Sequence, residues 1–251
     1  MPEFAEVNIQ VGYLRKHCSN WKTDRFGLTG RCEQFTNIPE LERTQTVHEF
    51  FTDSQITDIY QRGKLIVITT NKGIIISHLM YCGRWSIESD PFVSNYKHHV
   101  KPPTEKTISF WLEDQKNRRL SFYDPQNQAK LRLYPGVTDL KRIEELASLG
   151  PEVMQTSFSA PGFATWSLTD FENDARVSRQ SIEKYLLDQH RVAGLGRTYV
   201  RESLNAAHID PKSRLNTLTS EQLKLIADTI VNMLQKSIDT KLDYGSIFES
   251  V

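Results

Sequence analysis

The spacing of apolar residues changes from a strand pattern to a helical pattern at about residue 136, and this change restricts the chain to an α+β architecture. Before that point, alternating or continuous apolar runs separated by turn residues occupy residues 55–70, 73–79, 106–113, 119–124 and 129–134. This spacing predicts an antiparallel two-layer β-sandwich or a flattened barrel over residues 1–135.

The start of the chain departs from the strand pattern. Apolar residues recur there at intervals of three, four and three, at Phe4, Val7, Val11 and Leu14. These positions share one face of an α-helix, and proline is favoured at the first helical position. We therefore expect an N-terminal helix that begins at Pro2 and packs on the β domain.

The second part of the chain is predicted to be helical. Periodicity and end signals mark helices at residues 138–149, 167–175, 178–189, 197–207 and 219–237. Residues 136–166 join the first of these helices to an interdomain linker rich in Ser, Pro and Gly. Residues 167–251 form the predicted helical domain, in which Gly194 and Gly196 allow a tight turn between two helices.

Composition excludes several classes of protein. The 251 residues have no apolar run of membrane-spanning length and no secretory signal, so we expect a soluble, intracellular protein. The three cysteines form no Cys-x-x-Cys pair, which excludes a disulfide framework and a thiolate zinc finger, and we expect no metal or other cofactor. The 31 Lys and Arg residues balance 31 Asp and Glu residues, so binding to nucleic acid must depend on local charge.

Such a local charge occurs in the helical half of the chain. Residues 176–214 carry eight Lys and Arg residues against four Asp and Glu residues, an excess of four positive charges. Outward-pointing backbone amides of the Gly194–Gly196 turn, with arginines beside them, could clamp consecutive phosphates. A solvated basic face would have the same composition.

Pro2 is a candidate nucleophile. Removal of Met1 would leave a secondary amine at the start of a helix, whose positive end disfavours protonation of that amine. The amine could attack a sugar C1′ carbon and form a Schiff base, with Glu3 or Glu6 of the first turn as general acid or base. The same three residues also make an ordinary helix start, because proline and acids are favoured there.

Two residues at strand ends could contact phosphate. Lys64 follows Gly63 at the start of an apolar run and can project its ammonium from a sheet edge, although most such lysines are solvated flanks. His78 ends another apolar run and can donate to a phosphate or serve as a hydrogen-bonded structural histidine.

These segments together resemble the formamidopyrimidine-DNA glycosylase and endonuclease VIII (Fpg/Nei) family of base-excision repair enzymes. The resemblance extends over essentially the whole chain and is strongest in the last of five segments. They are MPEFAEV at 1–7, RGKL at 62–65, ISHL at 76–79, LGPE at 149–152, and LLDQHRVAGLG at 186–196 followed by AHIDP at 207–211.

The resemblance implies a fold and an activity. The fold is an N-terminal helix on a two-layer antiparallel β-sandwich, followed by a helical domain with a helix-two-turn-helix DNA-binding element. The activity is that of a bifunctional glycosylase and AP lyase, which excises an oxidised base and cleaves the strand by β,δ-elimination. The implied partner is damaged DNA, double- or single-stranded, and we expect a monomer without membrane attachment.

The resemblance also implies roles for individual residues. Pro2 would form the Schiff base, Glu3 would donate and shuttle protons, and Glu6 would support the site. Lys64 would hold the phosphate next to the lesion and assist elimination. The residues implied to contact DNA are His78, Tyr81, Gln189, Gly194, Gly196 and Arg197.

Four features depart from the family pattern. Arg197 occupies the place of a phosphate-contacting asparagine. Residues 124–128, DPQNQ, lack the Arg and Phe that the Fpg branch inserts opposite the flipped base, and Met80-Tyr81 replaces its Gly-Met, which makes Tyr81 the candidate for stacking into the gap. Val251 falls about where the family's zinc or zincless finger would begin, so we expect that finger to be absent.

These features favour the Nei-like branch acting on oxidised pyrimidines or hydantoins. Two alternatives remain open. One is a non-catalytic or lyase-only DNA-binding protein on the same fold, which Arg197 and the missing finger favour. The other is an unrelated β-plus-helical interaction module.

Overall fold

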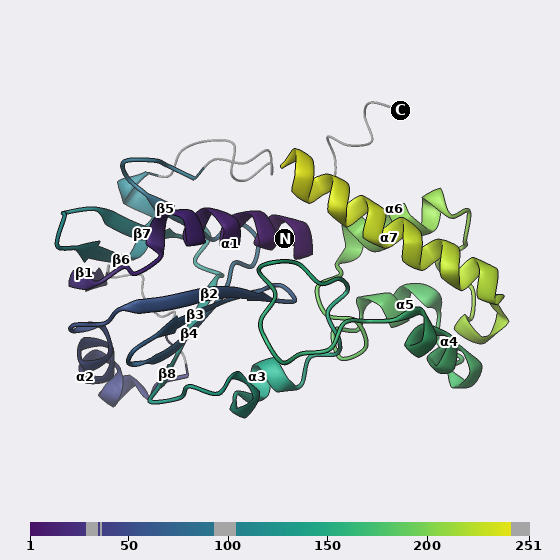
Figure 1. The fold of residues 1–251 in the computed structure, drawn as a ribbon, viewed down its shortest axis with the longest axis horizontal. Coiled ribbons are helices and arrows are strands. Elements are labelled where there is room, and N and C mark those ends of the chain that lie inside the picture. The colour runs from purple at the N-terminus through teal and green to yellow at the C-terminus, as the bar shows by residue number, and fades with distance from the viewer. Residues whose placement is uncertain (29–34, 36, 93–103, 242–251) are drawn as a thin grey trace.

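The computed structural model describes residues 1–28, 35, 37–92 and 104–241, and it contains two four-stranded antiparallel sheets (Figure 1). The first sheet has the order β1 (Thr23–Leu28), β6 (Ile108–Asp114), β7 (Arg119–Tyr123), β5 (Arg84–Ile87). The second has the order β2 (Ile56–Arg62), β3 (Leu65–Thr70), β4 (Gly73–His78), β8 (Lys130–Pro135). The predicted sandwich is therefore confirmed, with its main core between the two sheets.

The predicted run over residues 55–70 is two strands. β2 and β3 form a hairpin in which Arg62 pairs with Leu65, and Gly63 and Lys64 make the turn. Gly63 has a φ of +55°, a conformation that glycine adopts without the penalty of a Cβ atom. The turn carries Lys64 out of the sheet toward the helical part of the molecule.

Helix α1 (Phe4–Cys18) connects both parts of the molecule (Figure 1). Val7, Val11 and Leu14 enter the core of the sandwich, whereas Phe4 and Ala5 belong to the core of the helical domain. The expectation that this helix packs on the β domain describes only its later turns. The expected start at Pro2 is also wrong, because Glu3 is extended (φ −107°, ψ −166°) and serves as the N-cap.

Residues 138–149 are not one helix. Asp139 accepts a hydrogen bond from the backbone N–H of Lys141 and caps the short 3₁₀ turn η2 (Leu140–Arg142). Ile143 then adopts an extended conformation, and a single α-helical turn follows as α3 (Glu144–Ala147). The extended residue interrupts the helix that the apolar spacing predicted.

The helical domain contains four α-helices within its described residues. They are α4 (Leu168–Val177), α5 (Ile182–Leu187), α6 (Arg197–Ala206) and α7 (Ser220–Thr240), with 3₁₀ turn η3 (Leu215–Thr217) before the last. Helix α5 is shorter than the predicted 178–189, because Ser181 caps its start and Asp188 is extended at its end. Residues 242–251 of the predicted domain lie outside the described part.

The remaining elements were not predicted from the sequence. They are helix α2 (Glu40–Phe51), the strands β1 and β5, and a 3₁₀ turn η1 (Glu105–Thr107). Within the described residues, no helix is both long enough and apolar enough to cross a membrane.

Candidate functional site

Glu3 lies at the N-terminus of α6, although 195 residues separate it from Thr198. Its Oε1 accepts the backbone N–H of Thr198 at 3.0 Å, and its Oε2 accepts that of Tyr199 at 3.4 Å. The first amides of a helix lack partners within the helix and form its positive end, so a carboxylate is stabilised there. The side chain is only 4% exposed, so the catalytic candidate is held in a fixed, largely dry position.

Gly196 is the residue that permits this approach. A Cβ atom at position 196 would lie 2.3 Å from Glu3 Cδ, well inside van der Waals contact. Any other residue there would push the carboxylate away from α6. The second glycine of the predicted turn therefore creates space for Glu3.

Glu6 occupies a different environment one turn further along α1. Its Oε2 accepts the backbone N–H of Glu3 at 2.9 Å, and its Oε1 accepts the hydroxyl of Tyr199 at 3.0 Å. Burial raises the pKa of Glu6 to about 7, and the nearby negative charge of Glu3 adds to the rise while hydrogen bonds oppose it. Glu6 can thus exchange a proton at neutral pH.

Pro2 is buried immediately before these carboxylates. The next peptide is fixed from the helical domain, because Phe4 N–H donates to the carbonyl of Gly194 at 3.1 Å. The Pro2 nitrogen carries a peptide bond to Met1, so it becomes a secondary amine only after Met1 is removed.

Lys64 joins the acidic residues from the β2–β3 turn. Burial lowers the pKa of its ammonium, and the charges of Glu3 and Glu6 act on it in the opposite direction. The turn itself touches the helical domain, because a Cβ at Gly63 would lie 3.3 Å from both Ala193 Cβ and Gly194 N. The structure therefore brings together all four residues that the sequence analysis named as catalytic.

The buried pair of Arg62 and Glu152 fixes this junction. Arg62 Nη1 donates to Glu152 Oε1 at 2.5 Å, and Nη2 donates to the carbonyls of Leu149 and Gly150 at 2.6 and 2.8 Å. Glu152 also accepts the backbone N–H of Gly63. Both residues lie in segments that carry the family resemblance, but sequence reasoning gave neither of them a role.

Gln189 organises the loop between α5 and α6. Its Nε2 donates to the carbonyls of Leu187 and Leu195, and its Oε1 accepts the N–H of Gly194 at 3.0 Å. These bonds hold the loop in place, and the DNA contact expected of Gln189 stays a prediction. The amide of Gly194 has a protein acceptor, so the expectation of outward-pointing amides in the turn is wrong at this position. The amides of Thr198 and Tyr199, which follow the turn in α6, also have protein acceptors.

Three predicted DNA-contacting side chains lie at or near the surface. Arg197 is exposed at the first residue of α6, and Tyr81 is 48% exposed in the turn after β4. His78 ends β4 opposite Leu65, the neighbour of Lys64. Burial lowers the pKa of His78 to about 4, with the positive charge of Lys64 adding to the effect, so the imidazole is neutral at pH 7.

The loop of residues 124–128 is closed by its own aspartate. Asp124 is 1% exposed and its Oδ2 accepts the backbone N–H of Ala129 at 2.7 Å.

Burial raises the pKa of the neighbouring Cys82 thiol, and the amino group of Met1 is among the charges that act on it. That effect indicates that the start of the chain lies near the turn that carries Tyr81.

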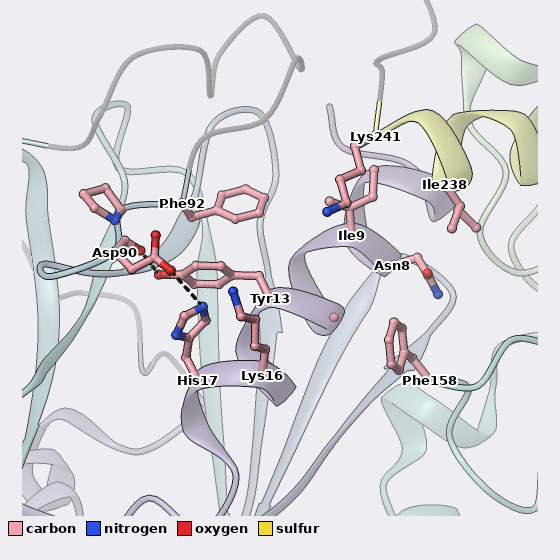
Figure 2. A pocket seen from close by; sticks show the side chains of 12 residues that line it. Asn8, Ile9, Tyr13, Lys16, His17, Asp90, Phe92, Phe158, Ile238 and Lys241 are labelled. Atoms are coloured by element: carbon pink, nitrogen blue, oxygen red, sulfur yellow. Dashed lines mark hydrogen bonds and ion pairs between the residues drawn. The ribbon is translucent and has the colours of Figure 1, made fainter.

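A separate hollow of about 410 Å³ lies on the surface formed by α1, the end of α7 and residues 90–92 (Figure 2). Figure 2 shows Tyr13 and His17 turned toward Asp90, whose carbonyl and carboxylate they contact at 2.7 and 3.2 Å. None of the predicted catalytic or DNA-contacting residues lines it.

The described residues contain no group of three or more His, Cys, Asp or Glu side chains placed to hold a metal ion. Cys18 and Cys82 are buried free thiols, and Cys32 lies outside the described residues. Once Met1 is removed, the chemistry available at the junction would be that of an amine beside two carboxylates, with the ammonium of Lys64 acting on both.

Both parts of the chain match domain models of one family of known proteins. The model of the formamidopyrimidine-DNA glycosylase N-terminal domain matches residues 1–131, and that of the formamidopyrimidine-DNA glycosylase H2TH domain matches residues 149–248. The formamidopyrimidine-DNA glycosylase of Rhizorhabdus wittichii is 30% identical over 241 residues, which cover 95% of this chain and 79% of that protein. The enzyme of Mycoplasma genitalium is 26% identical over 96% of this chain and 76% of its own length.

Solved structures of similar proteins have the same fold as this chain. Lactococcus lactis Fpg in complex with abasic-site DNA has a TM-score of 0.74 at 23% identity, over 94% of this chain and 78% of that chain. The same protein in complex with DNA containing an oxidised pyrimidine has a TM-score of 0.74 at 26% identity, over 95% and 80%. With both of its domains matched, the chain belongs to the formamidopyrimidine-DNA glycosylase family of bifunctional DNA glycosylases and AP lyases.

Proposed function

We propose that this chain excises oxidised bases from DNA and then nicks the strand, through a Schiff base formed by Pro2. The observation that carries the proposal is the convergence of Pro2, Glu3, Glu6 and Lys64 at the domain junction. An amine nucleophile needs a proton donor and acceptor beside it, and the two carboxylates meet that need.

The proposed covalent step begins when Met1 has been removed. The Pro2 nitrogen attacks the sugar C1′ carbon, the bond between C1′ and the base breaks, and the base leaves with a proton. Glu3, held by the amides of α6, shuttles protons during sugar opening and Schiff base formation. The resulting iminium acidifies the neighbouring C2′ position, which allows elimination of the 3′ phosphate and then of the 5′ phosphate.

Phosphate contacts from both domains would hold the flipped nucleotide in place. Lys64 and neutral His78 approach from the β domain, and Arg197 approaches from α6. A nucleotide that leaves the stack needs its flanking phosphates fixed while C1′ faces the amine. The three side chains supply one neutral donor and two cationic donors for that purpose.

We extend the proposal to oxidised pyrimidines or hydantoins as substrates, in double- or single-stranded DNA. Tyr81 is exposed and can stack in the gap, while the 124–128 loop is bound to Asp124 and lacks the Arg and Phe of the Fpg branch. The related Lactococcus lactis protein has a solved complex with DNA that contains an oxidised pyrimidine. The Nei-like branch, the lack of a cofactor and the domain boundaries remain predictions.

The decisive experiment is borohydride trapping on abasic-site DNA. Reduction of a Schiff base leaves a stable covalent adduct, which peptide mapping should locate at Pro2 in protein that lacks Met1. An adduct at a lysine would contradict the assignment to Pro2. Binding of the DNA without any adduct would instead support a non-catalytic DNA-binding protein on the same fold.

Glu3→Gln provides a second test of the chemistry. The substitution removes a proton shuttle but no phosphate ligand, so we expect base excision to be lost while DNA affinity stays within about threefold. Single-turnover excision and equilibrium binding should be measured on one preparation. Excision at the parent rate would make Glu3 a structural residue.

A further inference from the structure

Tyr199 contacts both N-terminal carboxylates from α6. Its backbone N–H donates to Glu3 at 3.4 Å and its hydroxyl donates to Glu6 at 3.0 Å. The Glu3 N–H donates to the other oxygen of Glu6 at 2.9 Å, which closes a ring of hydrogen bonds through three residues. Tyr199 is fully buried, so water does not compete for these contacts.

The ring influences the ionisation of Glu6. Its two carboxylate oxygens accept hydrogen bonds from two different donors, and both donors stabilise the negative charge. Burial and the charge of Glu3 favour the protonated form of Glu6, whereas hydrogen bonds from the backbone N–H groups of Glu3 and Glu6 and from the Tyr199 hydroxyl favour the carboxylate. The Tyr199 hydroxyl therefore contributes to the ionisation of Glu6 at neutral pH.

The ionised Glu6 in turn orients the chain at the nucleophile. It accepts the N–H of Glu3, the peptide group that directly follows Pro2. Orientation of this peptide sets the direction in which the Pro2 ring and its nitrogen point. Loss of the carboxylate would loosen the first residues of the chain without removing any group that contacts DNA.

On the basis of the function proposed above, we propose that Tyr199 is a positioning residue for the Schiff base chemistry. It acts through Glu6 and keeps Glu3 and the Pro2 nitrogen in their reactive orientation. Because Tyr199 belongs to the helical domain, the N-terminal nucleophile is reactive only while both domains are packed together.

Other ionisable groups also act on Glu6. They are Glu3 on its own helix, Lys64 on the β2–β3 turn and Tyr199 on α6. Glu3 raises the pKa of Glu6, and a positive charge on Lys64 favours the carboxylate. Burial keeps the pKa of Tyr199 well above its usual value, so its hydroxyl is neutral at pH 7. Tyr199→Phe therefore removes a hydrogen-bond donor to Glu6 without removing a charged group.

The test compares Tyr199→Phe with the parent protein and with Tyr185→Phe. Tyr185 is a matched control because it is also buried in the helical domain and donates to a carboxylate, Asp174 Oδ2, at 2.9 Å. The readouts are the borohydride trapping rate at pH 7 and the titration of the Glu6 carboxyl carbon followed by ¹³C NMR without DNA.

We expect Tyr199→Phe to raise the pKa of Glu6 by about one unit, because a hydrogen bond to a charged group is lost. The ionised fraction of Glu6 at pH 7 would then fall about fivefold, and trapping should slow by about the same factor. DNA affinity should not change, and Tyr185→Phe should behave like the parent. In the Glu6→Gln background, Tyr199→Phe should have no further effect on the trapping rate, because the two changes remove the same interaction.

Two results of the trapping assay would overturn the inference and leave the proposed function intact: a parent-like trapping rate in folded Tyr199→Phe, or an equal loss in Tyr185→Phe. If the parent itself forms no adduct, the proposed function fails and the positioning role fails with it. The NMR titration needs neither DNA nor turnover, and an unshifted Glu6 pKa in Tyr199→Phe would by itself contradict the coupling. If Tyr199→Phe fails to fold, a trapping rate in Glu6→Gln equal to the parent's would overturn the inference.

Discussion

At the scale of single residues, the structure places two carboxylates three positions apart in contrasting environments. Glu3 accepts the backbone amides of Thr198 and Tyr199 at the positive end of α6. Glu6 is buried with a tyrosine hydroxyl and a backbone amide, and its pKa rises to about 7. The two carboxyl groups therefore differ in their surroundings, and burial lets Glu6 exchange a proton at neutral pH.

The raised pKa of Glu6 predicts a pH-dependent difference in stability between Glu6→Gln and the parent. A carboxyl whose pKa rises from 4.5 to about 7 on folding stabilises the fold fully below pH 4.5, and this contribution is lost as the pH rises through 7. Relative to the parent, Glu6→Gln should therefore gain up to about 3 kcal/mol in its free energy of unfolding between pH 4.5 and pH 8. Urea unfolding at several pH values measures this change, and a difference that is constant with pH would contradict the raised pKa.

At the scale of elements, the sequence predicted strong periodic segments and missed the weak ones. Helix α7 was predicted to within a few residues because a regular apolar stripe follows its Thr219 capping box. Helix α2 was missed because only Val47, Phe50 and Phe51 are buried, all near its C-terminal end. The residues of β5 are all buried, and a run of four with Arg84 in it gives no recognisable alternation.

The catalytic candidates were predicted from motifs, but their partners were not. Glu3 reaches amides 195 residues away, and no local pattern encodes that distance. For the same reason, the glycine turn was expected to offer its amides to phosphate, whereas Gln189 already accepts the amide of Gly194. Glu3 accepts the amides of Thr198 and Tyr199 in the first turn of α6. Long-range partners of this kind require the tertiary structure.

The side chain of Arg197 is exposed at the first residue of α6, where it can donate to a phosphate. We expect Arg197→Ala to lower the magnitude of the slope of log K against log salt by about 0.7 to 0.9. Affinity for damaged and undamaged DNA should fall alike, because phosphate contacts carry no base information. Salt titrations should include Lys224→Ala as a control, since this exposed lysine of α7 is paired with Asp228.

Two results would refute this role of Arg197. An unchanged salt slope would make it a solvated surface residue. A loss confined to lesion-bearing DNA would place it in the lesion pocket.

At the scale of the whole molecule, the site exists only where the two domains meet. Phe4 and Ala5 of α1 are packed in the helical core, while the rest of the helix is anchored in the sandwich (Figure 1). The β2–β3 turn brings Lys64 to the same junction, and the linker residue Glu152 fixes that turn. The placement of both domains is therefore part of the catalytic geometry.

The Arg62–Glu152 pair should dominate the stability of this junction. Both side chains are 1% exposed, so Arg62→Met would leave a buried carboxylate without its partner, at a cost of about 3 to 5 kcal/mol at neutral pH. Burial already raises the pKa of Glu152 while Arg62 opposes the rise. Without Arg62, the pKa of Glu152 in the folded protein should rise further above its value in the unfolded chain. The variant should therefore lose stability as the pH increases and recover part of that stability in acid.

Urea unfolding between pH 5 and pH 8 tests this expectation against two further variants. Arg62→Met combined with Glu152→Gln should recover part of the loss and reduce its pH dependence, because no buried charge remains.

Arg132→Met should cost less than about 1 kcal/mol, because the Arg132–Glu145 pair is partly exposed at 24% on each side and water screens it. Equal losses in Arg62→Met and Arg132→Met would show that the junction does not depend on the buried pair. A large loss confined to Arg62→Met, with slower borohydride trapping in the folded variant, would tie the position of Lys64 to that ion pair.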